Sequence, residues 1–228
     1  AGDITVADSI AGGTGTNTLV ASAVDIDTNT DLADASDLVG LARVSNIQTL
    51  EVSGVGAAGG TTVLIDASRV DTSISTITVT NAVGANASTF TFNTGASTIN
   101  FAGALGAATH VLVASGSGAS DAVTAVNTNT AAADTFATQA LTLTGIETVN
   151  FNSGATATAA QSTGAIGLTG TGTNPATTVN VTGVNAFTLG AVTNAGTGLL
   201  SISGSGMTAK AAGTTTLTVA APVTTGGT

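Results

Sequence analysis

The residues best suited to binding a metal ion cluster in the run from Asp25 to Asp37, Asp-Ile-Asp-Thr-Asn-Thr-Asp-Leu-Ala-Asp-Ala-Ser-Asp. Five of the eleven aspartates of the chain fall within these thirteen residues. Oxygen-bearing side chains recur at alternate positions, the spacing by which a loop turns several oxygens toward one hard cation. The run is not an EF-hand, because Thr30 and Ser36 stand where that loop needs Gly and Glu. It predicts a looser calcium site made by Asp25, Asp27, Asn29, Asp31 and Asp34.

A Gly-rich turn precedes this run, Gly12-Gly-Thr-Gly-Thr-Asn-Thr-Leu-Val20. It fits the calcium-binding nonapeptide G-G-x-G-x-D-x-U-x, with Asn17 at the acidic position. Glycines let such a turn present carbonyl oxygens inward, and the acidic position adds a side-chain oxygen. With Asp8 just before it and the aspartate run after it, a calcium turn is favoured over a plain turn.

A weaker copy of the run lies one hundred residues further on, in Ala125–Asp134, where Asn129 and Asp134 repeat Asn29 and Asp34. Alanine or asparagine replaces three aspartates there, so we expect a weaker calcium site or none. The repetition predicts two tandem modules of about one hundred residues, 1–106 and 107–228.

The remaining carboxylates are more isolated, and capping or turn hydrogen bonds are the commoner role for such residues. They are Asp66, Asp71, Asp121 and Asp134. Glu51 and Glu147 are interpreted as surface positions on strands, and His110 as a structural residue.

Composition excludes several functions. Three basic residues against thirteen acidic ones give a net charge of −10, and nucleic-acid binding needs the basic footprint that is missing. No apolar run is long enough for a spanning helix, so we expect no membrane insertion. There is no Cys, so disulfides and thiolate sites are absent. Ten uncompensated negative charges instead suggest divalent cations.

Alternating apolar and polar residues dominate the chain and predict an all-β fold of many short strands. The one helical pattern is Asp31–Val44. Small residues at like spacing favour a parallel β-solenoid or β-roll, with β-sandwich modules as the alternative. The predicted strands are Thr61–Asp66, Ile74–Thr80, Thr89–Asn93, Ser97–Phe101, His110–Val113, Leu141–Thr144, Glu147–Phe151, Thr177–Thr182, Leu199–Ser203 and Thr214–Ala220.

The order of Gly-rich nonapeptide, acidic linker and a strand reading Asn46-Ile-Gln-Thr-Leu-Glu-Val or Gly145-Ile-Glu-Thr-Val-Asn-Phe resembles the repeats-in-toxin (RTX) type surface-layer proteins of Gram-negative bacteria. The resemblance implies an extracellular, calcium-dependent lattice protein at the cell surface, with this chain as a segment of something longer. Carried over residue by residue, the calcium ligands come from Gly13, Gly15 and Asn17, and from Asp121 near the second turn.

We therefore expect a non-enzymatic structural protein of a secreted surface layer, which assembles with itself and with calcium. Another part of the parent protein could attach it to cell-surface polysaccharide. An adhesin or extracellular filament subunit is the alternative. A secreted solenoid enzyme acting on polysaccharide ranks third, because such an enzyme needs paired carboxylates and usually aromatic platforms, and the chain has no Trp or Tyr.

Overall fold

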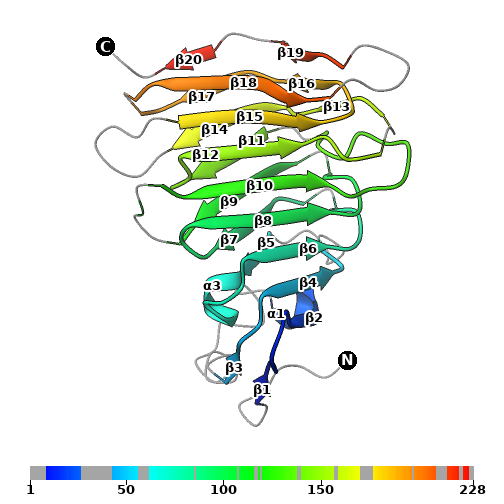
Figure 1. Ribbon diagram of the computed structural model, residues 1–228, viewed down its shortest axis with the longest axis vertical. Coiled ribbons are helices and arrows are strands. Elements are labelled where there is room, and N and C mark those ends of the chain that lie inside the picture. Colours follow the sequence, from blue (N-terminus) through cyan, green and yellow to red (C-terminus); the bar gives the residue numbers. More distant parts are fainter. Residues whose placement is uncertain are drawn as a thin grey trace.

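The protein is a parallel β-solenoid whose coils stack from the N-terminal to the C-terminal end (Figure 1). The computed structural model describes residues 9–26, 43–55, 62–84, 86–106, 108–115, 118, 120–137, 140–156, 159–169, 177–196, 198–208, 215–220 and 223–225. Each pair of strands within this part of the chain is parallel, which confirms the predicted solenoid and rules out antiparallel sandwich modules.

One sheet, here called the long sheet, runs through almost the whole described chain. Its strands are β2 (Thr18–Ser22), β4 (Thr49–Ser53), β6 (Thr76–Val79), β8 (Ala96–Phe101), β10 (Ala122–Asn127), β12 (Thr148–Asn152), β15 (Thr177–Gly183) and β18 (Leu200–Met207). Thr98 pairs with Thr124, and Thr124 with Asn150, so one coil takes 26 residues here (124 − 98 and 150 − 124).

A second sheet forms the opposite wall of the coils and lies behind the long sheet in Figure 1. Its strands are β5 (Val63–Asp66), β7 (Ser88–Phe92), β9 (Thr109–Ala114), β11 (Ala140–Thr144), β14 (Ala165–Thr169), β17 (Val192–Asn194) and β20 (Val223–Thr225). A third, short sheet contains β13 (Gln161–Ser162), β16 (Phe187–Leu189) and β19 (Leu217–Val219), and β1 (Ile10–Ala11) pairs with β3 (Val44–Ser45). Among the described residues, two one-turn helices lie near the N-terminal end, α1 (Ala23–Ile26) and α3 (Ala67–Val70).

The sequence alternation becomes the wall of the solenoid. In β12, Val149 and Phe151 are buried while Asn150 faces outward, and β4, β6, β8, β10 and β15 alternate in the same way. Threonines therefore meet across strands on the outer face. The column Thr18, Thr49, Thr76, Thr98 and Thr124 is continuous in register.

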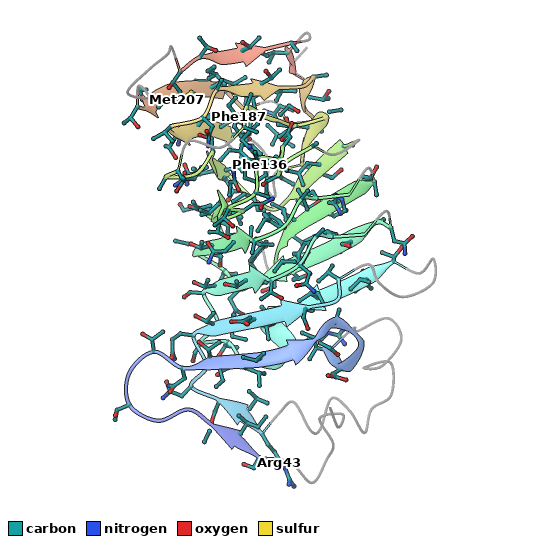
Figure 2. The ribbon with its side chains drawn as sticks, turned by 90° about the vertical axis from the view of Figure 1, so that its right-hand side faces the viewer. Arg43, Phe136, Phe187 and Met207 are labelled. Carbon is teal, nitrogen blue, oxygen red and sulfur yellow. The ribbon has the colours of Figure 1, made fainter. Side chains whose placement is uncertain are left out.

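The interior contains a spine of aromatic rings among small aliphatic residues. All six Phe are buried, and five of them are joined by ring contacts. Phe136 lies at the centre of this spine, with its ring centroid 5.7 Å from Phe151, 5.6 Å from Phe187 and 6.2 Å from Phe101. Figure 2 shows Phe136 and Phe187 together inside the coils, far from Arg43 at the N-terminal end.

Each of the ten predicted strand segments overlaps a strand of the structure, with ends that differ by a few residues. The predicted helix Asp31–Val44 falls mainly outside the described residues, and its last residue, Val44, begins β3. The division at residues 106 and 107 stays a prediction. Across it the long sheet is continuous, because β8 pairs in register with β10. Within the described residues, no helix combines the length and apolar character needed to cross a lipid bilayer.

Candidate cation-binding corners

The Gly-rich turn before β2 is closed by the side chain of Asn17. Its amide nitrogen donates to the carbonyl oxygens of Gly13 (2.9 Å), Gly15 (3.3 Å) and Asn46 (2.9 Å). Carbonyl oxygens that converge in this way are the ligands expected around a cation, and here an amide N–H₂ group lies among them. Gly12 is required beside this group, because an added Cβ would overlap Asn46 O and the Asn17 side chain.

Asn17 is joined to the next coil through Gln48. The backbone N–H of Asn17 donates to Gln48 Oε1 at 2.9 Å. In return the N–H groups of Gln48 and Thr49 both donate to Asn17 O, at 3.0 Å each. Asn17 and Gln48 are each the residue immediately before a strand of the long sheet. We call them the neutral corner pair.

Asp121 and Glu147 form the same arrangement further along the solenoid, before β10 and β12. Asp121 N donates to Glu147 Oε2 at 2.8 Å, and the N–H groups of Glu147 and Thr148 donate to Asp121 O at 2.9 and 3.1 Å. The turn conformation matches as well. Asn46, two residues before Gln48, has φ 59°, and Gly145, two residues before Glu147, has φ 68°. We call Asp121 and Glu147 the acidic corner pair.

Both residues of the acidic corner pair are buried, because Asp121 is only 2% exposed and Glu147 only 6% exposed. The interpretation of Glu147 as a surface residue is therefore wrong. The alternation itself carries the signal, because Glu147 shares its parity with the buried Val149 and Phe151. Glu51, by contrast, alternates with the buried Leu50 and Val52 and lies on the outer face.

The other described members of the predicted calcium sites bond to neighbouring backbone and hydroxyl groups. Asp25 lies in α1 and accepts from Ser22 Oγ at 2.8 Å. Asp134 accepts from the N–H groups of Phe136 (3.2 Å) and Ser162 (2.9 Å) and from Ser162 Oγ. The remaining predicted ligands lie outside the described residues: Asp8, Asp27, Asn29, Asp31 and Asp34.

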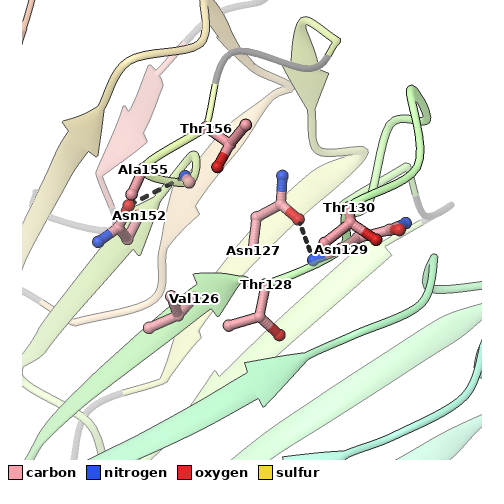
Figure 3. A pocket seen from close by; sticks show the side chains of 9 residues that line it. Val126, Asn127, Thr128, Asn129, Thr130, Asn152, Ala155 and Thr156 are labelled. Carbon is pink, nitrogen blue, oxygen red and sulfur yellow. Dashed lines mark hydrogen bonds between the residues drawn. The ribbon is translucent and has the colours of Figure 1, made fainter.

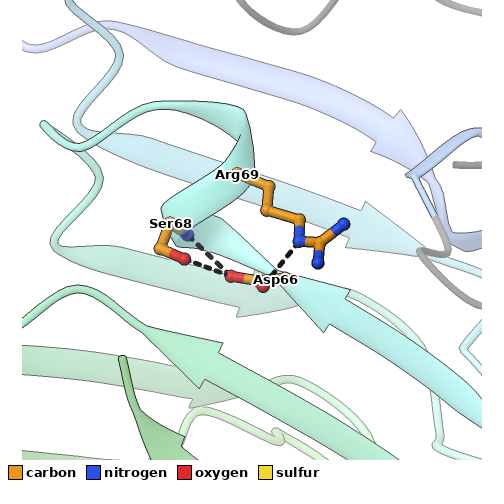
Figure 4. Close-up of polar contacts among 3 residues, drawn as sticks. All are labelled: Asp66, Ser68 and Arg69. Carbon is orange, nitrogen blue, oxygen red and sulfur yellow. Dashed lines mark hydrogen bonds and ion pairs between the residues drawn. The ribbon is translucent and has the colours of Figure 1, made fainter. Parts of the chain in front are cut away.

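Asp66 and Asp71 confirm the capping or turn hydrogen bonds predicted for isolated carboxylates. Asp66 caps α3, accepting from Ser68 N at 3.0 Å and Ser68 Oγ at 2.6 Å, and it pairs with Arg69 Nε at 3.3 Å (Figure 4). Asp71 accepts from Ile47 N of the adjacent coil at 2.7 Å and from Ser73 N at 2.9 Å. The Arg69–Asp66 contact is the one ion pair within the described part of the chain.

A hollow of about 190 Å³ lies beyond the C-terminal ends of β10 and β12, at the weaker copy of the aspartate run (Figure 3). Its lining includes Asn127, Asn129 and Asn152 and contains no titratable side chain. Asn127 Oδ1 accepts from Asn129 N at 2.9 Å, and Asn152 Oδ1 accepts from Gly154 N at 2.9 Å. These amides stabilise the turns, and the lining offers no group for acid–base catalysis.

His110 is buried in β9, next in register to Ser88 of β7. Its Nε2 lies 3.1 Å from Gly106 O, so Nε2 carries the hydrogen, while Nδ1 has no hydrogen-bond partner among the residues described. Burial lowers the pKa of His110, and the hydrogen bond to Gly106 offsets part of that effect. The side chains of His110 and Ser88 are both 0% exposed, so neither is accessible from the surface.

These corners define a parallel β-solenoid in which side-chain oxygens bridge successive coils. Among the described residues, no three His, Asp or Glu side chains gather in a way that could hold one metal ion. Comparison with known protein families, with curated proteins and with solved structures finds no match to this chain. Its function must be argued from the geometry.

Proposed function

We propose that this protein is a structural component of an extracellular lattice, of the kind formed by RTX-type surface-layer proteins, and that calcium stabilises its folded form. The observation that carries the proposal is the unbroken long sheet, whose eight strands stay parallel from β2 to β18. A body of this form is stiff along its axis and presents the same outer face on each coil.

The chemistry of the surface supports a scaffold better than an enzyme. The outer face of the long sheet carries columns of small hydroxyl and amide side chains, such as Thr98, Thr124 and Asn150. Such side chains offer repeated hydrogen-bonding groups to a neighbouring subunit. The described hollow, in turn, has no carboxylate pair of the kind a glycosidase requires.

The charge supports an extracellular, calcium-dependent assembly. A net charge of −10 with three basic residues repels itself, and divalent cations reduce that repulsion. Extracellular modules usually bind calcium in the ~0.1–1 mM range, so their sites fill outside the cell and stay empty inside it. At calcium ten times the dissociation constant, each site adds about 1.4 kcal/mol to the free energy of unfolding.

Negative-stain electron microscopy of the purified chain, in millimolar calcium and in chelator, tests the proposal. We expect ordered sheets in calcium and dispersed particles in chelator. Fibres in place of sheets would favour the adhesin or filament subunit instead. Monodisperse particles under both conditions, confirmed by sedimentation, would contradict a lattice function.

A further inference from the structure

Two buried oxygens of the acidic corner pair lack partners within the described part of the chain. Asp121 Oδ1 accepts from Gly95 N at 2.5 Å, and Glu147 Oε2 accepts from Asp121 N, but Asp121 Oδ2 and Glu147 Oε1 have no hydrogen-bond partner among the described residues. Buried carboxylate oxygens are expected to be hydrogen-bonded, paired with a cation or bound to metal. Two such oxygens on adjacent coils therefore need an explanation.

A third unpartnered oxygen continues the column. Thr178 N donates to Glu147 O at 2.8 Å, which places Thr177 next to Glu147 on the following coil. Thr177 is buried, and its Oγ1 also has no hydrogen-bond partner in the part of the chain that the structure describes. Because neighbouring strands lie about 4.8 Å apart, the column Asp121, Glu147 and Thr177 stacks oxygen donors along one edge of the interior.

The positive charge that would balance this pair is not supplied by the described side chains. Arg69 pairs with Asp66 beside α3, and Arg43 lies at the N-terminal end of the solenoid (Figure 2). Removing a charge from water without a counter-charge is strongly unfavourable. Asp121 and Glu147 place two such carboxylates on consecutive coils, so this unfavourable free energy arises twice.

The neutral corner pair shows that the structural role of these residues needs no charge. Gln48 Oε1 accepts a hydrogen bond from Asn17 N, just as Glu147 Oε2 accepts one from Asp121 N. Gln161 Oε1 likewise accepts a hydrogen bond from Thr135 N at 2.8 Å. An amide oxygen is thus sufficient to join the coils. At the neutral pair the Asn17 N–H₂ group lies among the turn oxygens, and an aspartate at that position has no such donor.

Gly118 completes the arrangement. A Cβ at this residue would overlap Asp121 Oδ2, so the backbone of Gly118 lies directly against the carboxylate. Gly118 thereby lies beside the Asp121 carboxylate as Gly12 lies beside the Asn17 amide.

From these observations we infer that Asp121 and Glu147 bind a divalent cation between the coils of β10 and β12, through Asp121 Oδ2 and Glu147 Oε1, with Thr177 Oγ1 as a neighbouring oxygen donor. The choice of calcium among divalent ions rests on the proposed function. The location of the ion rests on the buried carboxylates alone.

Calorimetric titration of the whole chain with calcium tests this site, using Glu147→Gln and the matched control Glu51→Gln. Both variants remove one negative charge from the same sheet, but Glu51 lies on the outer face. The glutamine at position 147 retains the hydrogen bond seen at Gln48, so the variant is expected to fold, which circular dichroism checks.

We expect Glu147→Gln to lose the tightest binding event or to weaken it on the order of tenfold or more, since carboxylate count sets the affinity of such sites. Glu51→Gln should bind as the unchanged chain does. Equal binding by all three proteins would overturn the site while leaving calcium-dependent assembly intact. Absence of calcium binding by the unchanged chain would overturn both.

Discussion

Glu147 and Gln48 perform the same hydrogen-bonding task at positions 99 residues apart (147 − 48). Each residue immediately precedes a strand of the long sheet, and its side-chain oxygen accepts a hydrogen bond from a backbone N–H of the preceding coil. The donor to Glu147 is Asp121 N at 2.8 Å, and the donor to Gln48 is Asn17 N at 2.9 Å. One of the two carries a charge and the other does not. This difference separates a structural role, which both satisfy, from a proposed ionic role that belongs to Glu147.

Converting the neutral corner pair into an acidic one should create a calcium-dependent corner. In Asn17→Asp with Gln48→Glu, the new carboxylate no longer donates to Gly13 O and Asn46 O, and it repels both carbonyls. Loss of these hydrogen bonds should lower the free energy of unfolding by about 1–3 kcal/mol in chelator. Calcium should restore most of the loss, as measured by thermal melting. Equal melting in calcium and chelator would refute the equivalence of the two corners.

Space at Gly118 is predicted to matter, whereas space at Gly13 is not. Gly118→Ala places a methyl group against Asp121 Oδ2, and such overpacking usually costs about 1–3 kcal/mol. An added Cβ at Gly13 meets nothing within 4 Å, so Gly13→Ala should stay within about 0.5 kcal/mol of the unchanged chain. Urea unfolding compares the two variants, and a harmless Gly118→Ala would show that Gly118 does not lie against the carboxylate.

Acid should destabilise the protein through His110. Its pKa is lowered in the folded state, so the unfolded chain takes up the proton first as pH falls below about 6.5. Stability is therefore complete above that pH and falls below it, by at most about 1.4 kcal/mol per pH unit until the folded-state pKa is reached.

The variant His110→Gln isolates this contribution. It removes the titrating ring, so the difference in melting temperature between it and the unchanged chain should shrink as the pH falls from 7.5 towards 5. A difference that does not depend on pH would exclude His110 as the titrating group.

The aromatic spine should hold adjacent coils together. Phe136 contacts rings from β8, β12 and β16, and Phe136→Ala should cost about 3–5 kcal/mol through loss of packing and creation of a cavity. In a solenoid each coil depends on its neighbours, so hydrogen exchange should rise most in β10 to β16. Val20→Ala, at a residue 66% exposed, is the control with little expected effect. Uniform exchange along the chain would argue against this local coupling.

The strands could be predicted from the sequence because a two-residue period survives even in short segments such as Thr148–Asn152. The sequence favours parallel pairing of these strands but does not determine the length of each coil. The register between neighbouring strands depends on hydrogen bonds at corner pairs whose residues lie 26 or 31 positions apart. Asn17 and Gln48 illustrate this point, because no local pattern tells that one caps the other.

The acidic corner pair was only half predictable. Asp121 was a candidate ligand through the family resemblance, but Glu147 was missed because an isolated glutamate on a strand usually faces solvent. Its parity with Val149 and its alignment with Gln48 were the available signals. The aspartate run at residues 25–37 remains a predicted calcium loop, since most of it lies outside the described residues.

The measurement that tests the central claim most directly is the melting temperature of the unchanged chain in calcium, in magnesium and in chelator at equal ionic strength. Calcium binding to the folded state alone must raise the melting temperature with concentration. Magnesium should do so less, because it demands stricter geometry and loses its waters reluctantly. A melting temperature that is the same in all three solutions would contradict the claim that divalent ions stabilise this scaffold.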